Sequence, residues 1–104
     1  MGNVYKKLQS CVEFEWDEYN ARKNWIKHRV TPSECEQIFF NQPLIVAVDI
    51  KHSEEEERFF SLGKTDTGKK LFIVFTIRGK ALRVISARQM NKKEKRSYDE
   101  HEKK

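Results

Sequence analysis

The pattern of apolar and polar positions predicts strands at the start and in the middle of the chain. Residues 12–16 alternate apolar and acidic side chains, a period of two that indicates a half-buried strand. Residues 44–48 are continuously apolar over the length of one strand. The polar stretch 49–57 ends in four consecutive glutamates, so it is predicted to be a loop.

Three further apolar runs predict an antiparallel meander. Residues 58–62 and 70–76 flank Thr65-Asp66-Thr67-Gly68, whose glycine suits the left-handed position of a short hairpin turn. A second turn at Arg78-Gly79-Lys80 leads into residues 81–87. Because short turns join strands that run in opposite directions, these three strands are expected to be neighbours in one sheet.

A first helix is predicted directly after the first strand. Asp17 is a suitable N-cap residue, and Ala21 with Trp25 forms an i, i+4 apolar pair. The helix is expected to continue to about Lys27. Trp25 and Trp16 are interpreted as packing residues, with stacking on nucleic-acid bases as the alternative.

Two capping boxes mark the other helices. Thr31-Pro32-Ser33-Glu34 combines cap, first-turn proline and returning glutamate, and Asn41-Gln42-Pro43 ends this helix. Asn91 with Glu94 opens the last helix, and residues 101–104 are expected to fray. The buried stripe of the middle helix is predicted to be Cys35, Ile38 and Phe39. The order of strand, two helices, strand meander and final helix gives an α+β class.

The charge is distributed unevenly. Residues 64–96 hold eleven Lys and Arg against two Asp and Glu, whereas residues 1–63 hold eight against eleven. A face that collects these cations would attract polyanions such as nucleic acid. The alternative is a solvated basic surface. The glutamates at 54–57 are expected to be solvated, with shielding of the basic site as the alternative.

Length and cysteine content narrow the class of protein. The 104 residues fit a single domain, 1–104, and the two cysteines show neither a CxxC motif nor nearby paired histidines. Neither a disulfide framework nor a metal site is predicted, and no cofactor is expected. The first residues lack the apolar region of a signal peptide, and no stretch approaches membrane-spanning length. A cytoplasmic protein without membrane contact is expected.

Ordered motifs over residues 14–98 resemble the BrnT family of toxins. They begin with Phe14-Glu15-Trp16-Asp17 and close with Glu94 and Tyr98. Between these ends lie Ala21, Asn24, Lys27-His28, Val30, His52-Ser53, Glu57-Arg58, Gly63, Thr76, Arg78, Arg83 and Ile85-Ser86-Ala87-Arg88. The resemblance implies a RelE-like fold, with an antiparallel sheet and the order of elements given above. It also implies an endoribonuclease toxin of a type II toxin–antitoxin pair that inhibits translation and growth.

Two positions depart from the family pattern. Asn20 stands where a lysine is frequent, and its absence is expected to weaken contact with RNA or a partner. Arg29 stands where a glycine is common and would close the first helix in the left-handed conformation. A non-glycine residue in that conformation costs about 1 kcal/mol.

The resemblance implies metal-independent cleavage, in which the ribose 2′-hydroxyl attacks the adjacent phosphate in line. Such a reaction needs cations that stabilise the phosphorane, and the planar guanidinium can bind two phosphate oxygens. We predict that this set is Arg58, Arg78, Arg83 and Arg88. In a regular strand, Arg83 and Arg88 would lie on opposite faces. Arg78 and Arg88 need not be neighbours, because strand ends twist and bulges shift the alternation. The alternative for each arginine is a surface or rim charge paired with a glutamate of the acidic loop.

The histidines are candidates for proton transfer because imidazole titrates near neutrality. His28 and His52 are predicted as acid or base, while capping of the helix end and simple solvation are their respective alternatives. Lys or Glu with a shifted pKa could carry the proton instead.

The remaining expectations concern binding partners. Further cations are predicted to contact RNA, namely Lys27, Lys80, Lys92, Lys93, Lys95 and Arg96. The resemblance implies a BrnA-like ribbon-helix-helix antitoxin and a possible toxin homodimer in its complex. The alternative function is a non-catalytic RNA- or protein-binding module derived from such a toxin.

Overall fold

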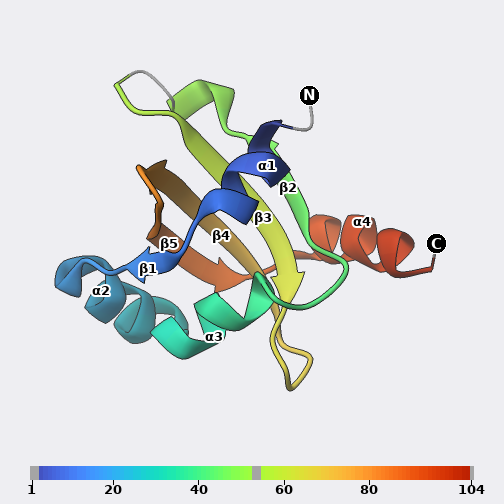
Figure 1. Cartoon of the computed structure of the whole chain (residues 1–104). Coiled ribbons are helices and arrows are strands. Elements are labelled where there is room, and N and C mark those ends of the chain that lie inside the picture. The colour runs from blue at the N-terminus through green and yellow to red at the C-terminus, as the bar shows by residue number, and fades with distance from the viewer. Residues whose placement is uncertain (1–2, 53–54, 104) are drawn as a thin grey trace.

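The chain folds around a five-stranded sheet in the order β1-β5-β4-β3-β2 (Figure 1). The computed structural model describes residues 3–52 and 55–103, and describes only the backbone of Asn3 and His52. Every predicted strand is present. The strands are β1 (Glu13–Glu15), β2 (Ile45–Val48), β3 (Arg58–Lys64), β4 (Lys70–Arg78) and β5 (Ala81–Gln89).

The meander is confirmed, but the expectation of a wholly antiparallel sheet is wrong. Strands β2 to β5 pair with their neighbours in antiparallel fashion, whereas β1 pairs with β5 in parallel, Phe14 opposite Leu82. The alternation of side chains that predicts β1 shows which of them are buried and not the direction of its partner. The sheet is therefore mixed.

Four α-helices accompany the sheet in the described part of the chain. The predicted helices are α2 (Glu18–His28), α3 (Pro32–Ile38) and α4 (Lys92–Glu102). The additional helix α1 (Asn3–Ser10) was not expected, although Val4 and Leu8 form an i, i+4 pair that packs on the core. The expected fraying from residue 101 is also wrong, since α4 continues to Glu102. Within the described ranges, no helix is long and apolar enough to cross a membrane.

The helix ends confirm the cap predictions. Asp17 accepts a hydrogen bond from the backbone of Asn20, and both Thr31 and Asn91 form complete capping boxes. Arg29 closes α2 in the left-handed conformation with φ 55, the conformation expected at this helix end. Its guanidinium lies over the ring of Trp25, 5.2 Å from the centroid.

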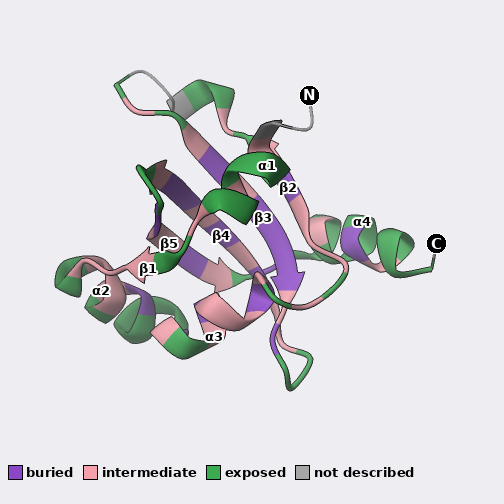
Figure 2. Ribbon diagram, viewed as in Figure 1, coloured by how far each residue is buried: buried purple, intermediate pink, exposed green. Residues whose placement is uncertain are grey.

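The main core lies between the sheet and the helices on one of its faces, where α1 and α3 lie (Figures 1 and 2). Cys35 and Ile38 are buried there as predicted, and burial raises the pKa of the Cys35 thiol to about 12. Phe39 is half-buried with its ring against Phe75. At Gly63 a side chain would meet the Ile38 Cβ at 2.9 Å, so glycine permits the close approach of α3 to β3.

Candidate active site on the open face of the sheet

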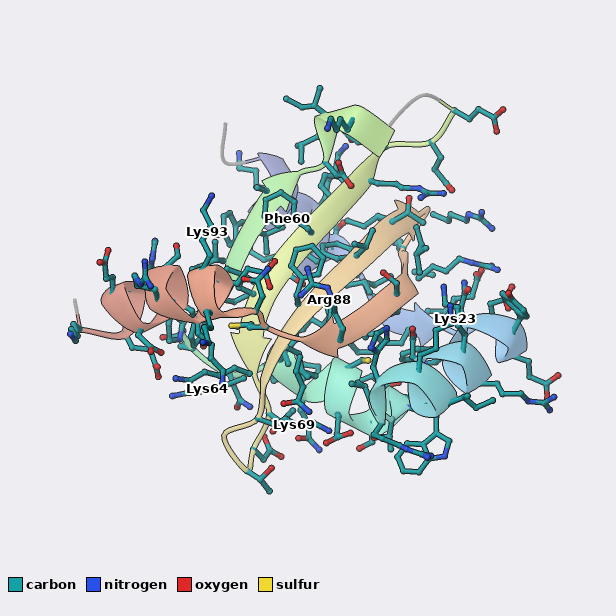
Figure 3. All side chains as sticks on the ribbon, turned by 180° about the vertical axis from the view of Figure 1, so that it is seen from behind. Lys23, Phe60, Lys64, Lys69, Arg88 and Lys93 are labelled. Atoms are coloured by element: carbon teal, nitrogen blue, oxygen red, sulfur yellow. The ribbon has the colours of Figure 1, made fainter. Side chains whose placement is uncertain are left out.

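The face of the sheet opposite α1 and α3 is here called the open face, and the described residues cover it only at one end. There Met90, just before α4, and Tyr98 of α4 pack onto Leu62, Phe72 and Ile45. The Tyr98 hydroxyl donates to the carbonyl of Pro43 at 2.6 Å, and burial raises its pKa to about 12. Figure 3 shows the sheet from this side. The open face consists of Arg58, Phe60, Leu62, Phe72, Val74, Thr76, Arg78, Arg83, Ser86 and Arg88.

A bulge in β5 brings Arg83 and Arg88 onto the same face. Val74 pairs with Ser86 but the next residue of β4, Phe75, pairs with Val84, so Ile85 is the extra residue. A bulge shifts the alternation of side chains by one. The expectation that Arg83 and Arg88 lie on opposite faces is therefore wrong. Because Ile85 is an extra residue, the alternation of side chains before it is shifted by one relative to the alternation after it.

Three of the predicted arginines gather at the uncovered end of the open face. Thr76 in the middle strand pairs with Arg58 on β3 and with Arg83 on β5, which makes one row across the sheet. Arg78 lies two residues further along β4 and shares this face. Arg88 pairs with Phe72, four residues from Thr76, or about 13 Å along the strand. Arg58, Arg78 and Arg83 thus form a cluster, and Arg88 lies apart.

Arg83 is held by two carboxylates from the start of the chain. Its Nη1 lies 2.6 Å from Glu15 Oε1 and its Nη2 lies 2.9 Å from Asp17 Oδ2. The pKa of Asp17 is lowered, first by the hydrogen bond from the Asn20 backbone and further by Arg83. With 22% of its side chain exposed, Arg83 is fixed in direction but still open to an anion.

The acidic connection between β3 and the preceding elements reaches the arginine cluster. Glu56 accepts hydrogen bonds from Arg78 Nε at 2.8 Å and Nη2 at 3.1 Å. This bond is the main cause of the lowered pKa of Glu56, to which the charges of Arg83 and Arg58 add. The adjacent carbonyl of Glu57 accepts from the buried Thr76 hydroxyl at 2.8 Å. The carboxylate of Glu56 therefore lies in the field of all three arginines while part of it stays exposed, which agrees with the alternative that this stretch shields the basic site.

Arg88 is fixed by a carboxylate and an aromatic ring. Its two terminal nitrogens lie 2.8 and 2.9 Å from the two oxygens of Glu94, and its guanidinium lies 4.2 Å from the centroid of Phe72. The hydrogen bond from Arg88 is the main reason why the pKa of Glu94 is lowered. The same glutamate completes the capping box of α4.

The predicted histidines are not brought to the arginine cluster by what is described. His28 is exposed at the last position of α2, whereas Asp17, the partner of Arg83, caps the other end. At 1.5 Å per residue these ends are about 15 Å apart. His52 ends the 3₁₀ helix η1 (Ile50–His52), and its side chain lies outside the described part of the structure.

The predicted RNA-binding cations occupy three separate places. Lys80 is exposed in the turn beside Arg78, and Lys27 is exposed on α2. The others are exposed on the first two turns of α4, beside Arg88, namely Lys92, Lys93, Lys95 and Arg96. In residues 3–52 and 55–103, no cluster of three His, Cys, Asp or Glu side chains could hold a metal ion.

Sequence reasoning missed the carboxylates that hold Arg83 and Arg88. Glu15 and Asp17 lie 66 or more positions from Arg83. The sequence spacing of Glu15 and Asp17 does not indicate that they pair with Arg83. The acidic residues in the alternating pattern of residues 12–16 were the one signal that could have suggested it. The sequence predicts Glu94 as a cap residue and not as a partner of Arg88. The pairing of Arg78 with Glu56 agrees with the alternative given for the arginines, a glutamate of the acidic loop.

Comparison with known proteins identifies the class. The family model described as the ribonuclease toxin BrnT of type II toxin–antitoxin systems matches residues 16–94. The chain is therefore a toxin of a type II toxin–antitoxin system. More particularly, it belongs to the BrnT family of ribonuclease toxins. The α1 helix and β1 precede the matched range.

A solved structure supports the fold. The crystal structure of the Brucella abortus ribonuclease toxin BrnT is similar with a TM-score of 0.56 and 20% sequence identity. The match covers 78% of this chain and 99% of the Brucella chain. At this identity the likeness shows the fold alone. No curated protein matches the sequence.

Proposed function

We propose that this chain is an endoribonuclease that cleaves RNA without a metal ion, and that the arginine cluster on the open face is its active site. The observation that carries the proposal is the row Arg58, Thr76 and Arg83 across three strands, with Arg78 beside it. Fixed cations on rigid strands are suited to a dianionic phosphorane, because they need not reorganise when its charge develops.

Arginine suits this role for chemical reasons. Its guanidinium stays protonated through the reaction and offers paired donors to two phosphate oxygens. The carboxylates Glu15 and Asp17 fix the direction of Arg83 by ion pairs of 2.6 and 2.9 Å. A phosphate bound at the cluster would replace part of this pairing and gain donors that are already oriented.

We assign acceptance of the 2′-hydroxyl proton to Glu56. Its lowered pKa keeps the carboxylate anionic at neutral pH, so it can take a proton, although it is a weak base. Its contact with Arg78 at 2.8 Å places it where a bound phosphate would compete for the same guanidinium. When the phosphate binds, Glu56 is released from Arg78 beside the attacking ribose. His28 and His52 stay predictions for the proton donated to the leaving oxygen.

Inhibition of translation and growth follows from RNA cleavage in the cell. A type II toxin has a protein antitoxin, and we infer that the antitoxin is a BrnA-like ribbon-helix-helix protein that covers the arginine cluster. A toxin homodimer held by that antitoxin is part of the same proposal. The support is the family membership together with the exposed cations around the open face.

A non-catalytic binding module is the second candidate. The observation in its favour is that Arg78, Arg83 and Arg88 each pair with a carboxylate, as structural arginines also do. Such a module would bind RNA or a protein through the same face without cleaving RNA.

Induction of the chain without an antitoxin tests the proposal. We expect growth arrest and loss of cellular RNA, and we expect the Arg83→Ala, Arg88→Ala double variant to permit growth while remaining folded by circular dichroism. The matched control is Arg22→Ala, an exposed arginine on α2. Arrest by the folded double variant would contradict the site, and binding without cleavage by the unaltered protein would favour the second candidate.

A further inference from the structure

An aromatic stack crosses the open face beside the arginine cluster. Phe60 and Phe72 lie on neighbouring strands with ring centroids 5.8 Å apart and planes 21° apart. The Arg88 guanidinium lies against Phe72 from β5, while Phe60 approaches from β3. Because β4 lies between those two strands, the three groups form a continuous stack of Arg88, Phe72 and Phe60.

The Phe60 end of this stack is open toward β2. The residue opposite Phe60 on β2 is Ala47, whose methyl group covers little of the ring. Both residues keep part of their surface exposed, so packing does not cover Phe60 completely. Figure 3 shows the labelled Phe60 and Arg88 on the open face of the sheet. A planar group laid on Phe60 would extend the stack by one layer.

The distance from Phe60 to the arginine cluster is similar to the distance between the base and the phosphate of one nucleotide. Arg58 and Phe60 are two residues apart on β3 and share the open face, so their Cα atoms are about 7 Å apart. A phosphate at Arg58 would therefore have its own base within reach of Phe60. Rings beside cations bind single-stranded nucleic acid in this way, and the stacking accepts any base because each has a π-face.

We propose that Phe60 is a stacking platform for one base of single-stranded RNA, positioned by the Arg88–Phe72 pair beneath it. The base lies next to the phosphate that the arginine cluster holds. This inference rests on the proposed RNA-binding role of the open face. Glu94 acts as a positioning residue, since its two bonds to Arg88 fix the guanidinium that supports Phe72.

The test measures binding without cleavage. The probe is a set of single-stranded RNA oligonucleotides with 2′-O-methyl groups, which remove the attacking hydroxyl, and binding is followed by fluorescence anisotropy. The variants are Phe60→Leu, which removes the π-face, and Phe60→Trp, which enlarges it. The control is Phe40→Leu, since Phe40 is 78% exposed and contacts Phe14 in the helix-covered half.

We expect Phe60→Leu to bind the probe about 5- to 100-fold more weakly, while Phe60→Trp retains affinity and Phe40→Leu is unchanged. Probes that each lack one base should identify one position at which the missing base weakens binding by the wild-type protein. At that position the missing base should not weaken binding by Phe60→Leu any further. Equal affinity of Phe60→Leu, or equal losses for both proteins at every position, would overturn the inference. Binding that depends on Phe60 in a protein that cleaves no RNA would overturn only the proposed catalytic function.

Discussion

The two faces of the sheet carry different kinds of side chain. On the face toward α1 and α3, strand β4 places Leu71, Ile73 and Phe75, all of them fully buried. The same strand places Phe72, Val74, Thr76 and Arg78 on the open face, among arginines and carboxylates. If the proposed function is correct, alternate residues of β4 contribute mainly to stability on one face and to RNA cleavage on the other, and mutations should separate the two properties.

The largest effect is expected at Arg83. Replacing it with alanine removes a fixed donor at the phosphate and should lower kcat for RNA cleavage on the order of 10³-fold. Arg83→Lys keeps the charge but loses the paired donors, so it should recover only part of the rate. The measurement is cleavage of a labelled RNA by purified protein, with Arg22→Ala as the control. A rate for Arg83→Ala equal to that of the control would contradict the assignment of Arg83 to the active site.

Glu56→Gln should separate binding from catalysis. Loss of the carboxylate removes a competing anion from Arg78, so RNA should bind more tightly. Loss of the proton acceptor should lower kcat by about 10²-fold. Glu55→Gln, a change at the exposed neighbouring glutamate, is the matched control. An unchanged kcat with tighter binding would mean that Glu56 only shields the cluster.

Two adjacent residues of β4 test the separation of the faces. Ile73→Ala opens a cavity in the helix-covered core and should lower the free energy of unfolding by about 2–5 kcal/mol. Val74→Ala changes the half-buried open face and should cost less, about 1 kcal/mol. Denaturant unfolding of both variants gives the comparison. Equal losses would show that the open face is packed like a core.

Gly63→Ala tests the contact between β3 and α3. The added methyl group would lie 2.9 Å from the Ile38 Cβ, so the helix must shift, at a cost of about 1–3 kcal/mol. Gly68→Ala is not a matched control, because Gly68 has a φ of 89 that disfavours any side chain. Ser86→Ala on the open face is a better one. Thermal unfolding that is unchanged in Gly63→Ala would contradict the close approach.

The smallest effect concerns pH. The pKa of Glu94 is lower in the folded protein than its unfolded value of about 4.3, so its pairing stabilises the fold above that value and is lost as pH falls through the folded pKa. Glu94→Gln should therefore lose less stability than the original protein between about pH 5 and pH 3. Melting temperatures over this range measure the difference. A steeper loss of stability in Glu94→Gln than in the wild-type protein would contradict this prediction.

The sequence predicts the strands and three of the four described α-helices, but not helix α1, the parallel pairing of β1 or the arrangement of the site. Caps at Asp17, Thr31 and Asn91 are local signals, and each was found where the residues indicated it. The bulge at Ile85 has no such signal, because it is defined by pairing with β4. It nevertheless decides that Arg83 and Arg88 share a face. The carboxylate partners of Arg83 are likewise joined to it only by the parallel pairing of β1 with β5.

The central claim is metal-free cleavage of RNA at the arginine cluster, and the products of one reaction test it most directly. Purified protein is incubated with a labelled single-stranded RNA in excess EDTA, and the ends of the fragments are identified. In-line attack by the 2′-hydroxyl predicts fragments ending in a 2′,3′-cyclic phosphate, which the wild-type protein should form and the Arg83→Ala variant should form about 10³-fold more slowly. Cleavage that stops on adding EDTA, or fragments that end in a 3′-hydroxyl, would contradict it.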